Sequence, residues 1–137
     1  MAREGFSVEY FCYENIGYSP KYVDELFDIL EECSKMVRYY LDTSVGYPDE
    51  LKSDIHKLSM DIDNLYLDFS TTYILIARLI NATKKEFFLS RKIKADKRLA
   101  KDISQKVSRL DKDLEKIVEK TRAYMKKIYV PKPISAA

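Results

Sequence analysis

The chain has 137 residues, of which 46% are hydrophobic and 34% are charged, and its net charge is +2. This composition is too apolar for an intrinsically disordered chain and too charged for a membrane protein. With three glycines and four prolines, a turn-rich β-sandwich or barrel is disfavoured, and the length predicts a single domain.

The N-terminal segment 1–19 is rich in aromatic residues. Weak alternation between Ser7 and Tyr13 predicts a short strand or an extended arm, whose rings need burial along the chain's own helices or on a neighbouring subunit. Five aromatic residues are candidate assembly contacts: Phe6, Tyr10, Phe11, Tyr13 and Tyr18. The segment has acidic residues and no continuous apolar run, so we expect no signal peptide.

A first amphipathic helix is predicted from Pro20 to about Asp42. Ser19 is a favourable N-cap and Pro20 is tolerated at the first helical position. Gly46 is the expected stop signal. Apolar residues recur at spacings of three and four, which places them on one helix face: Val23, Leu26, Leu30, Cys33, Val37 and Tyr40.

The 82 residues from Asp49 to Val130 contain neither glycine nor proline, which favours helix throughout. A first heptad pattern runs through Leu51, Ile55, Leu58, Ile62, Leu65, Phe69, Thr72, Ile76 and Leu79. A second runs through Ala100, Ile103, Val107, Leu110, Leu114, Ile117, Thr121, Tyr124 and Ile128. Folding the chain about Leu89–Ser90 brings the two apolar seams together.

The predicted fold is therefore all-α: a three-helix bundle in which two long helices form an antiparallel coiled-coil-like hairpin. An extended aromatic arm (1–19) precedes the bundle (20–129), and an extended tail (130–137) follows it, because Pro131 and Pro133 oppose helix. Thr83 and Glu86 form a capping-box pattern. A break near 81–95 would instead give a four-helix bundle.

Charge is distributed unevenly along the chain. Residues 1–81 have a net charge of −8 and residues 82–137 one of +10. The acidic and basic elements either pack together and neutralise each other, or they leave a polarised surface for an anionic partner. Asp54, Asp61 and Asp68 share one helix face and form either a solvated stripe or a docking stripe for a basic helix, such as the chain's own.

The segment 84–101 is the strongest functional lead, with a net charge of +6. Candidate contacts with nucleic acid or another anionic partner are its eight basic residues: Lys84, Lys85, Arg91, Lys92, Lys94, Lys97, Arg98 and Lys101. Lysine and arginine attract phosphate backbones, and the neighbouring Phe87 and Phe88 would stack on unpaired bases or insert at an anionic membrane surface. The structural alternative is a solvated basic turn with both rings buried in the bundle.

Catalytic and metal-binding motifs are missing from the sequence. The only histidine, His56, lies beside the apolar seam and is expected in solvent. Cys12 and Cys33 lack metal-ligand spacing and fit a reducing compartment, although a disulfide between them is an alternative. We expect no enzymatic activity, cofactor or metal ion.

The sequence thus predicts a non-enzymatic interaction or assembly protein that forms a homo-oligomer, docks a protein partner and has no transmembrane segment. The alternative is a nucleic-acid-binding protein, such as a coat, chromatin or replication accessory protein, that uses segment 84–101. The expected location is the cytoplasm, or the inside of a particle for a coat protein.

Overall fold

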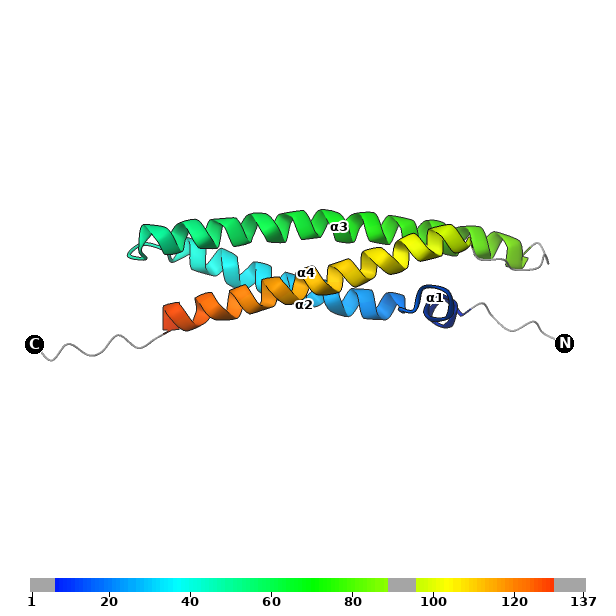
Figure 1. Ribbon diagram of the computed structural model, residues 1–137, viewed down its shortest axis with the longest axis horizontal. Helices are drawn as coiled ribbons and strands as arrows, with labels where there is room; N and C mark the ends of the chain where they lie inside the picture. Colours follow the sequence, from blue (N-terminus) through cyan, green and yellow to red (C-terminus); the bar gives the residue numbers. More distant parts are fainter. Residues whose placement is uncertain (1–6, 89–95, 130–137) are drawn as a thin grey trace, which may run out of the picture.

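The computed structural model describes residues 7–88 and 96–129, which form four helices and no strand (Figure 1). The helices are α1 (Val8–Ile16), α2 (Pro20–Asp42), α3 (Asp49–Phe88) and α4 (Lys97–Tyr129). The predicted all-α class is confirmed. The alternative of a four-helix bundle gives the right number of helices, but the additional helix is N-terminal rather than a product of a break near 81–95.

The three long helices contact one another pairwise and form an elongated bundle. α3 runs antiparallel to α2 and to α4, so α2 and α4 point in the same direction, and both lie on one side of α3 (Figure 1). The short α1 packs against α4 and α2 at the end of the bundle where α4 begins. The tail 130–137 and the predicted fold-back point Leu89–Ser90 lie outside the described residues.

The predicted extended arm is wrong for residues 8–16, which form α1 instead. The Ser7 side chain accepts a hydrogen bond from the Tyr10 N–H and caps the helix at its N-terminus. At the other end, Gly17 has a left-handed backbone (φ 88°), and its N–H donates to the Tyr13 carbonyl. Such a backbone is costly for other residue types. Phe11, Cys12 and Ile16 share the buried face of α1, which the weak alternation in the sequence did not indicate.

The predicted start of α2 is confirmed, because the Ser19 side chain accepts from the Tyr22 N–H and Pro20 occupies the first turn. The possible break at the capping-box pattern does not occur: α3 continues through Thr83 to Phe88. The Thr83 hydroxyl is buried and donates to the Leu79 carbonyl at 2.8 Å. It therefore bonds within the helix instead of capping a new one.

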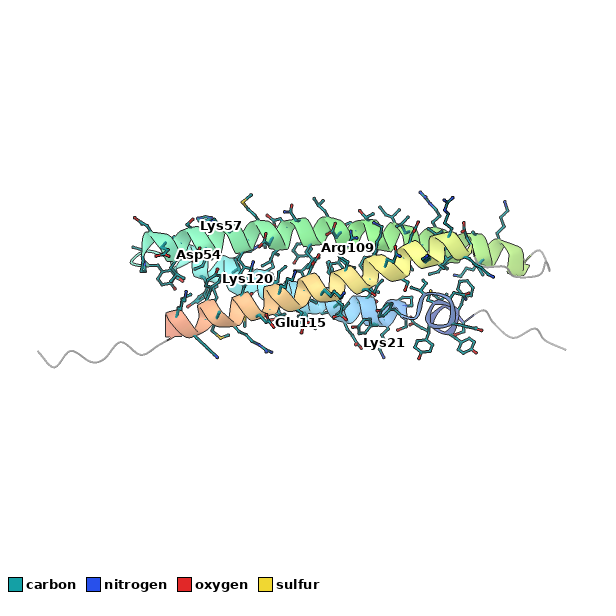
Figure 2. All side chains as sticks on the ribbon, in the orientation of Figure 1. Lys21, Asp54, Lys57, Arg109, Glu115 and Lys120 are labelled. Atoms are coloured by element: carbon teal, nitrogen blue, oxygen red, sulfur yellow. The ribbon has the colours of Figure 1, made fainter. Side chains whose placement is uncertain are left out.

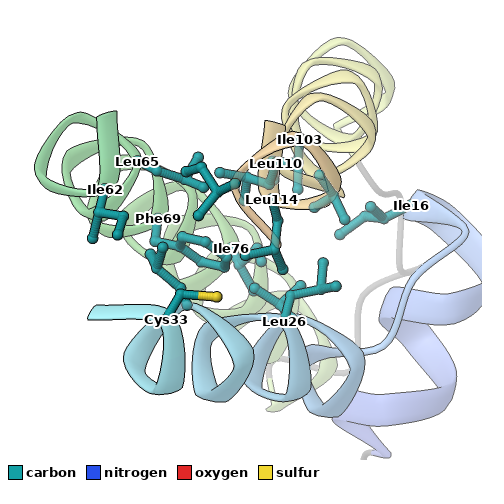
Figure 3. Packing of buried hydrophobic residues seen from close by; sticks show 14 of the residues in the cluster. Ile16, Leu26, Cys33, Ile62, Leu65, Phe69, Ile76, Ile103, Leu110 and Leu114 are labelled. Carbon is teal, nitrogen blue, oxygen red and sulfur yellow. The ribbon is translucent and has the colours of Figure 1, made fainter. Parts of the chain in front are cut away.

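The core follows the predicted apolar stripes, and side chains from all four helices meet in it (Figure 3). All six predicted positions on α2 are buried. Along α3 and α4 the buried seam residues are Ile55, Leu58, Ile62, Leu65, Phe69, Thr72, Ile76, Leu79, Ala100, Ile103, Val107, Leu110, Leu114, Ile117 and Thr121. The outermost members, Leu51, Tyr124 and Ile128, are half-buried at the end of the bundle.

Hydrogen bonds from tyrosines connect α2 and the α1–α2 linker to the other helices. The Tyr22 hydroxyl donates to Asp111 on α4 at 2.9 Å, and the Tyr18 hydroxyl bonds with that of Ser108 at the same distance. The Tyr73 hydroxyl of α3 donates to Asp24 on α2. These hydrogen bonds all lie near the start of α2, where they connect it to both α3 and α4.

Both cysteines are buried and free, so the alternative of a disulfide between them is not found. Burial, with a smaller contribution from Glu9, raises the pKa of the Cys12 thiol to about 11. Burial also raises the pKa of the Cys33 thiol, and the Thr121 hydroxyl and Arg122 act in the opposite direction. Both thiols are therefore protonated at neutral pH.

Candidate interaction surfaces

The acidic stripe of α3 faces the basic helix of its own chain. Asp61 forms an ion pair with Lys120 of α4 (N–O distance 3.5 Å), and both side chains are about half exposed. Figure 2 places Asp54 and Lys120 toward the same end of the bundle. Burial, followed by the negative charges of Asp54 and Asp61, raises the pKa of Tyr124 on α4.

Further charged side chains line the α3–α4 groove. Asp68 lines this groove together with Lys116 at one point and with Lys106 and Arg109 further along. Acidic side chains of α3 and basic side chains of α4 therefore lie along the same groove. This arrangement fits the expectation that the acidic stripe docks the chain's own basic helix.

The described part of the basic segment gathers at one end of the bundle, because α3 ends and α4 begins there (Figure 1). Lys85, Lys97, Arg98 and Lys101 are exposed and Lys84 is half-buried. Three further candidates lie outside the described residues: Arg91, Lys92 and Lys94.

The one described acidic side chain of the segment is occupied as a helix cap. Asp96 accepts from the backbone N–H groups of Arg98 and Leu99, at 3.1 and 3.0 Å. Beside it, Lys97 and Lys101 line an open hollow of about 410 Å³ with Asn15 of α1. Exposed lysine and arginine side chains of this kind attract anions by their charge, without reading sequence.

The structure separates the five aromatic candidates of the N-terminal segment. Phe11 is buried in the core of its own chain. Tyr18 is half-buried, where it stacks on Tyr22 with ring centroids 5.4 Å apart. Tyr10 and Tyr13 are 66% and 64% exposed, so they remain available to a partner. Phe6 lies outside the described residues.

A row of apolar side chains on α3 was missed by the sequence analysis. Met60, Leu67 and Ile74 are 65%, 68% and 62% exposed. They are spaced by seven residues, and their exposure and their positions between the seam residues place them on the face of α3 opposite its buried seam. The helices α2 and α4 both lie on one side of α3 (Figure 1). We call these three residues the outer row. Its signal was present in the sequence as a second seven-residue repeat, out of phase with the first.

Within residues 7–88 and 96–129, no group of three or more His, Cys, Asp or Glu side chains is placed to hold a metal ion. His56 is exposed, as expected. An open hollow of about 640 Å³ is lined by α4 residues such as Arg109, Lys112 and Glu115, and Figure 2 shows Arg109 and Glu115 along this helix.

Comparisons of the chain with protein-family models, curated proteins and solved structures give no match. Within the described ranges, no helix combines the length and hydrophobicity that crossing a lipid bilayer requires.

Proposed function

We propose that this chain is a non-enzymatic assembly protein that self-associates through the outer row of α3. The observation that carries the proposal is the exposure of Met60, Leu67 and Ile74 along a helix face that the chain's own helices leave uncovered. At 1.5 Å per residue the row spans about 21 Å. Apolar side chains aligned at heptad spacing are the feature by which helices associate.

The size of the row predicts a weak or moderate interaction. Removing each side chain from water contributes about 1–2 kcal/mol, since each is already about one-third covered. The six side chains of two copies would contribute about 6–12 kcal/mol, from which several kcal/mol of lost translational and rotational freedom are subtracted. We therefore expect a dissociation constant in the micromolar range or weaker.

Light scattering coupled to size-exclusion chromatography, from about 1 to about 100 micromolar protein, tests the proposal. The wild-type mass should rise with concentration. Leu67→Glu should remain monomeric with an unchanged helical circular dichroism spectrum, because position 67 is exposed in the single chain. Val45→Glu is the matched control: Val45 is 93% exposed but lies in the α2–α3 connection. A wild-type protein that stays monomeric throughout would refute the proposal.

Nucleic-acid binding is the second candidate function, and the exposed cations where α3 ends and α4 begins favour it. Binding to a fluorescent single-stranded oligonucleotide should weaken steeply as salt increases. A triple change of Lys97, Arg98 and Lys101 to alanine should weaken binding and reduce the salt dependence. The control triple removes the same charge at the opposite end of the bundle: Lys57, Lys126 and Lys127. Equal loss in both triples would contradict a site at the basic end.

A further inference from the structure

The charges of α3 are ordered along its axis in a way that bears on how a second copy would pack. Asp49 and Glu50 form its acidic first turn, whereas Lys85 is in its last turn. Asp49 and Lys85 each lie 18 residues from Leu67, which is about five helical turns. This spacing places both residues on the face of the outer row, and both are exposed.

We propose that α3 packs antiparallel against α3 of a second copy, about a two-fold axis that passes beside Leu67. This inference rests on the proposed function, and it specifies the partner, the orientation and the register. In this register Leu67 faces its own counterpart and Met60 faces Ile74. Asp49 of each copy lies opposite Lys85 of the other, so the interface is the same patch on both copies.

Charge selects the antiparallel orientation over the parallel one. A parallel pair in register would bring Asp49 against Asp49 and Lys85 against Lys85, and like charges that face each other repel. In the antiparallel pair the same residues attract. These pairs are exposed and screened by salt, so they favour an orientation more than they add affinity. Arg78 then faces His56, a pair that contributes no attraction.

The apolar residues select the register. Centring the pair on Leu67 joins all members of the outer row in three consecutive apolar layers. A shift by one heptad would put Leu67 against Ile74, but it would leave Met60 opposite the polar Asn81 and bring Lys57 opposite Lys84. The register centred on Leu67 therefore buries more apolar surface.

The residues between the apolar layers allow close approach of the two helices. Ser70 and Thr71 are small and exposed, and in this register they lie opposite Asn64 and Asp63. The Thr71 hydroxyl already donates to the Leu67 carbonyl of its own helix at 3.1 Å. Burial at the interface would therefore leave that hydroxyl hydrogen bonded.

Cysteine cross-linking under mild oxidation tests the arrangement, since a disulfide requires Cβ atoms about 4 Å apart. Leu67→Cys should form a covalent dimer by itself. Met60→Cys and Ile74→Cys should each fail alone but should cross-link when mixed, with one variant tagged so that the mixed dimer has a distinct mass. The wild-type protein gives the background, because its native Cys12 and Cys33 are buried, and Val45→Cys controls for random collisions.

Each outcome has a distinct meaning. If all three row variants cross-link with themselves, the pair is parallel. If Leu67→Cys cross-links with Ile74→Cys, the pair is antiparallel in the shifted register. Either result overturns this inference while the proposed self-association stands. A wild-type protein that is monomeric by light scattering, with no row variant cross-linking above the Val45→Cys control, would overturn both.

Discussion

Replacing Phe69 by alanine should destabilise the bundle more than any change at an exposed aromatic residue. Phe69 lies midway along α3 and is fully buried. Its ring meets that of Phe27 on α2 edge-on, with centroids 5.4 Å apart and an interplanar angle of 72°. Truncating a buried phenylalanine to alanine costs about 3–5 kcal/mol. The loss of the edge-on contact with Phe27 adds to this cost, so we expect the free energy of unfolding to fall by about 4–5 kcal/mol.

Urea denaturation, followed by circular dichroism at equal protein concentrations, measures this loss. For a chain of this size the slope is about 1.5–2 kcal/mol per molar urea, so the midpoint should fall by about 2–3 M. Tyr13→Ala is the matched control, because it removes an aromatic ring that is 64% exposed. That control should change stability by less than about 0.5 kcal/mol. If Phe69→Ala costs no more than Tyr13→Ala, the packing described for α2 and α3 is incorrect.

Three further predictions concern α1, the tyrosine contacts and the thiols. Gly17→Ala should lower the free energy of unfolding by about 1–2 kcal/mol, because it forces a left-handed backbone (φ 88°) on alanine. Amide hydrogen exchange in α1 should then accelerate, and Gly17→Asn should have a smaller effect on both quantities. Burial and the hydrogen bond to Asp111 raise the pKa of Tyr22 from 10 to about 12. The contribution of the protonated Tyr22 hydroxyl to the free energy of unfolding should therefore be complete below pH 10 and should disappear as the pH approaches 12. Thermal melts should show that Tyr22→Phe reduces this pH dependence, and a similar slope in that variant would refute the assignment. Cys12 and Cys33 should react slowly with a disulfide reagent at pH 8 in the native protein and rapidly in urea; rapid native labelling would contradict their burial.

The long helices could be predicted from the sequence because their periodicity is sustained. Repeats at spacings of three and four identify the face that a helix buries, and the predicted seam positions from Ile55 to Leu79 and from Ala100 to Thr121 are buried. Even Thr72 fits, since its hydroxyl donates to the Asp68 carbonyl of its own helix at 2.8 Å.

The N-terminal segment shows where such reasoning fails. α1 has nine residues, which is too short to be stable alone in water. Its formation depends on the caps at Ser7 and Gly17 and on packing of Phe11 and Ile16 into the core. The tertiary part of that stabilisation has no local signature in the sequence.

The outer row illustrates a different limit. The spacing of Met60, Leu67 and Ile74 is visible in the sequence, but a search for the core selects the stronger repeat beside it. Which face of α3 remains uncovered depends on where α2 and α4 pack, and that is a property of the assembled bundle rather than of a local pattern.

The polar contacts also determine which pairs of helices are held against sliding. Between α3 and α4, the one ion pair or hydrogen bond that the described residues form is the exposed contact of Asp61 with Lys120. The seam itself is a heptad repeat, so a slip of seven residues would again bring apolar side chains together. Each of the two helices is bonded to α2, through Tyr73 and through Tyr22. The alignment of α3 with α4 therefore depends on α2, because its hydrogen bonds to both helices oppose translation of α4 along α3.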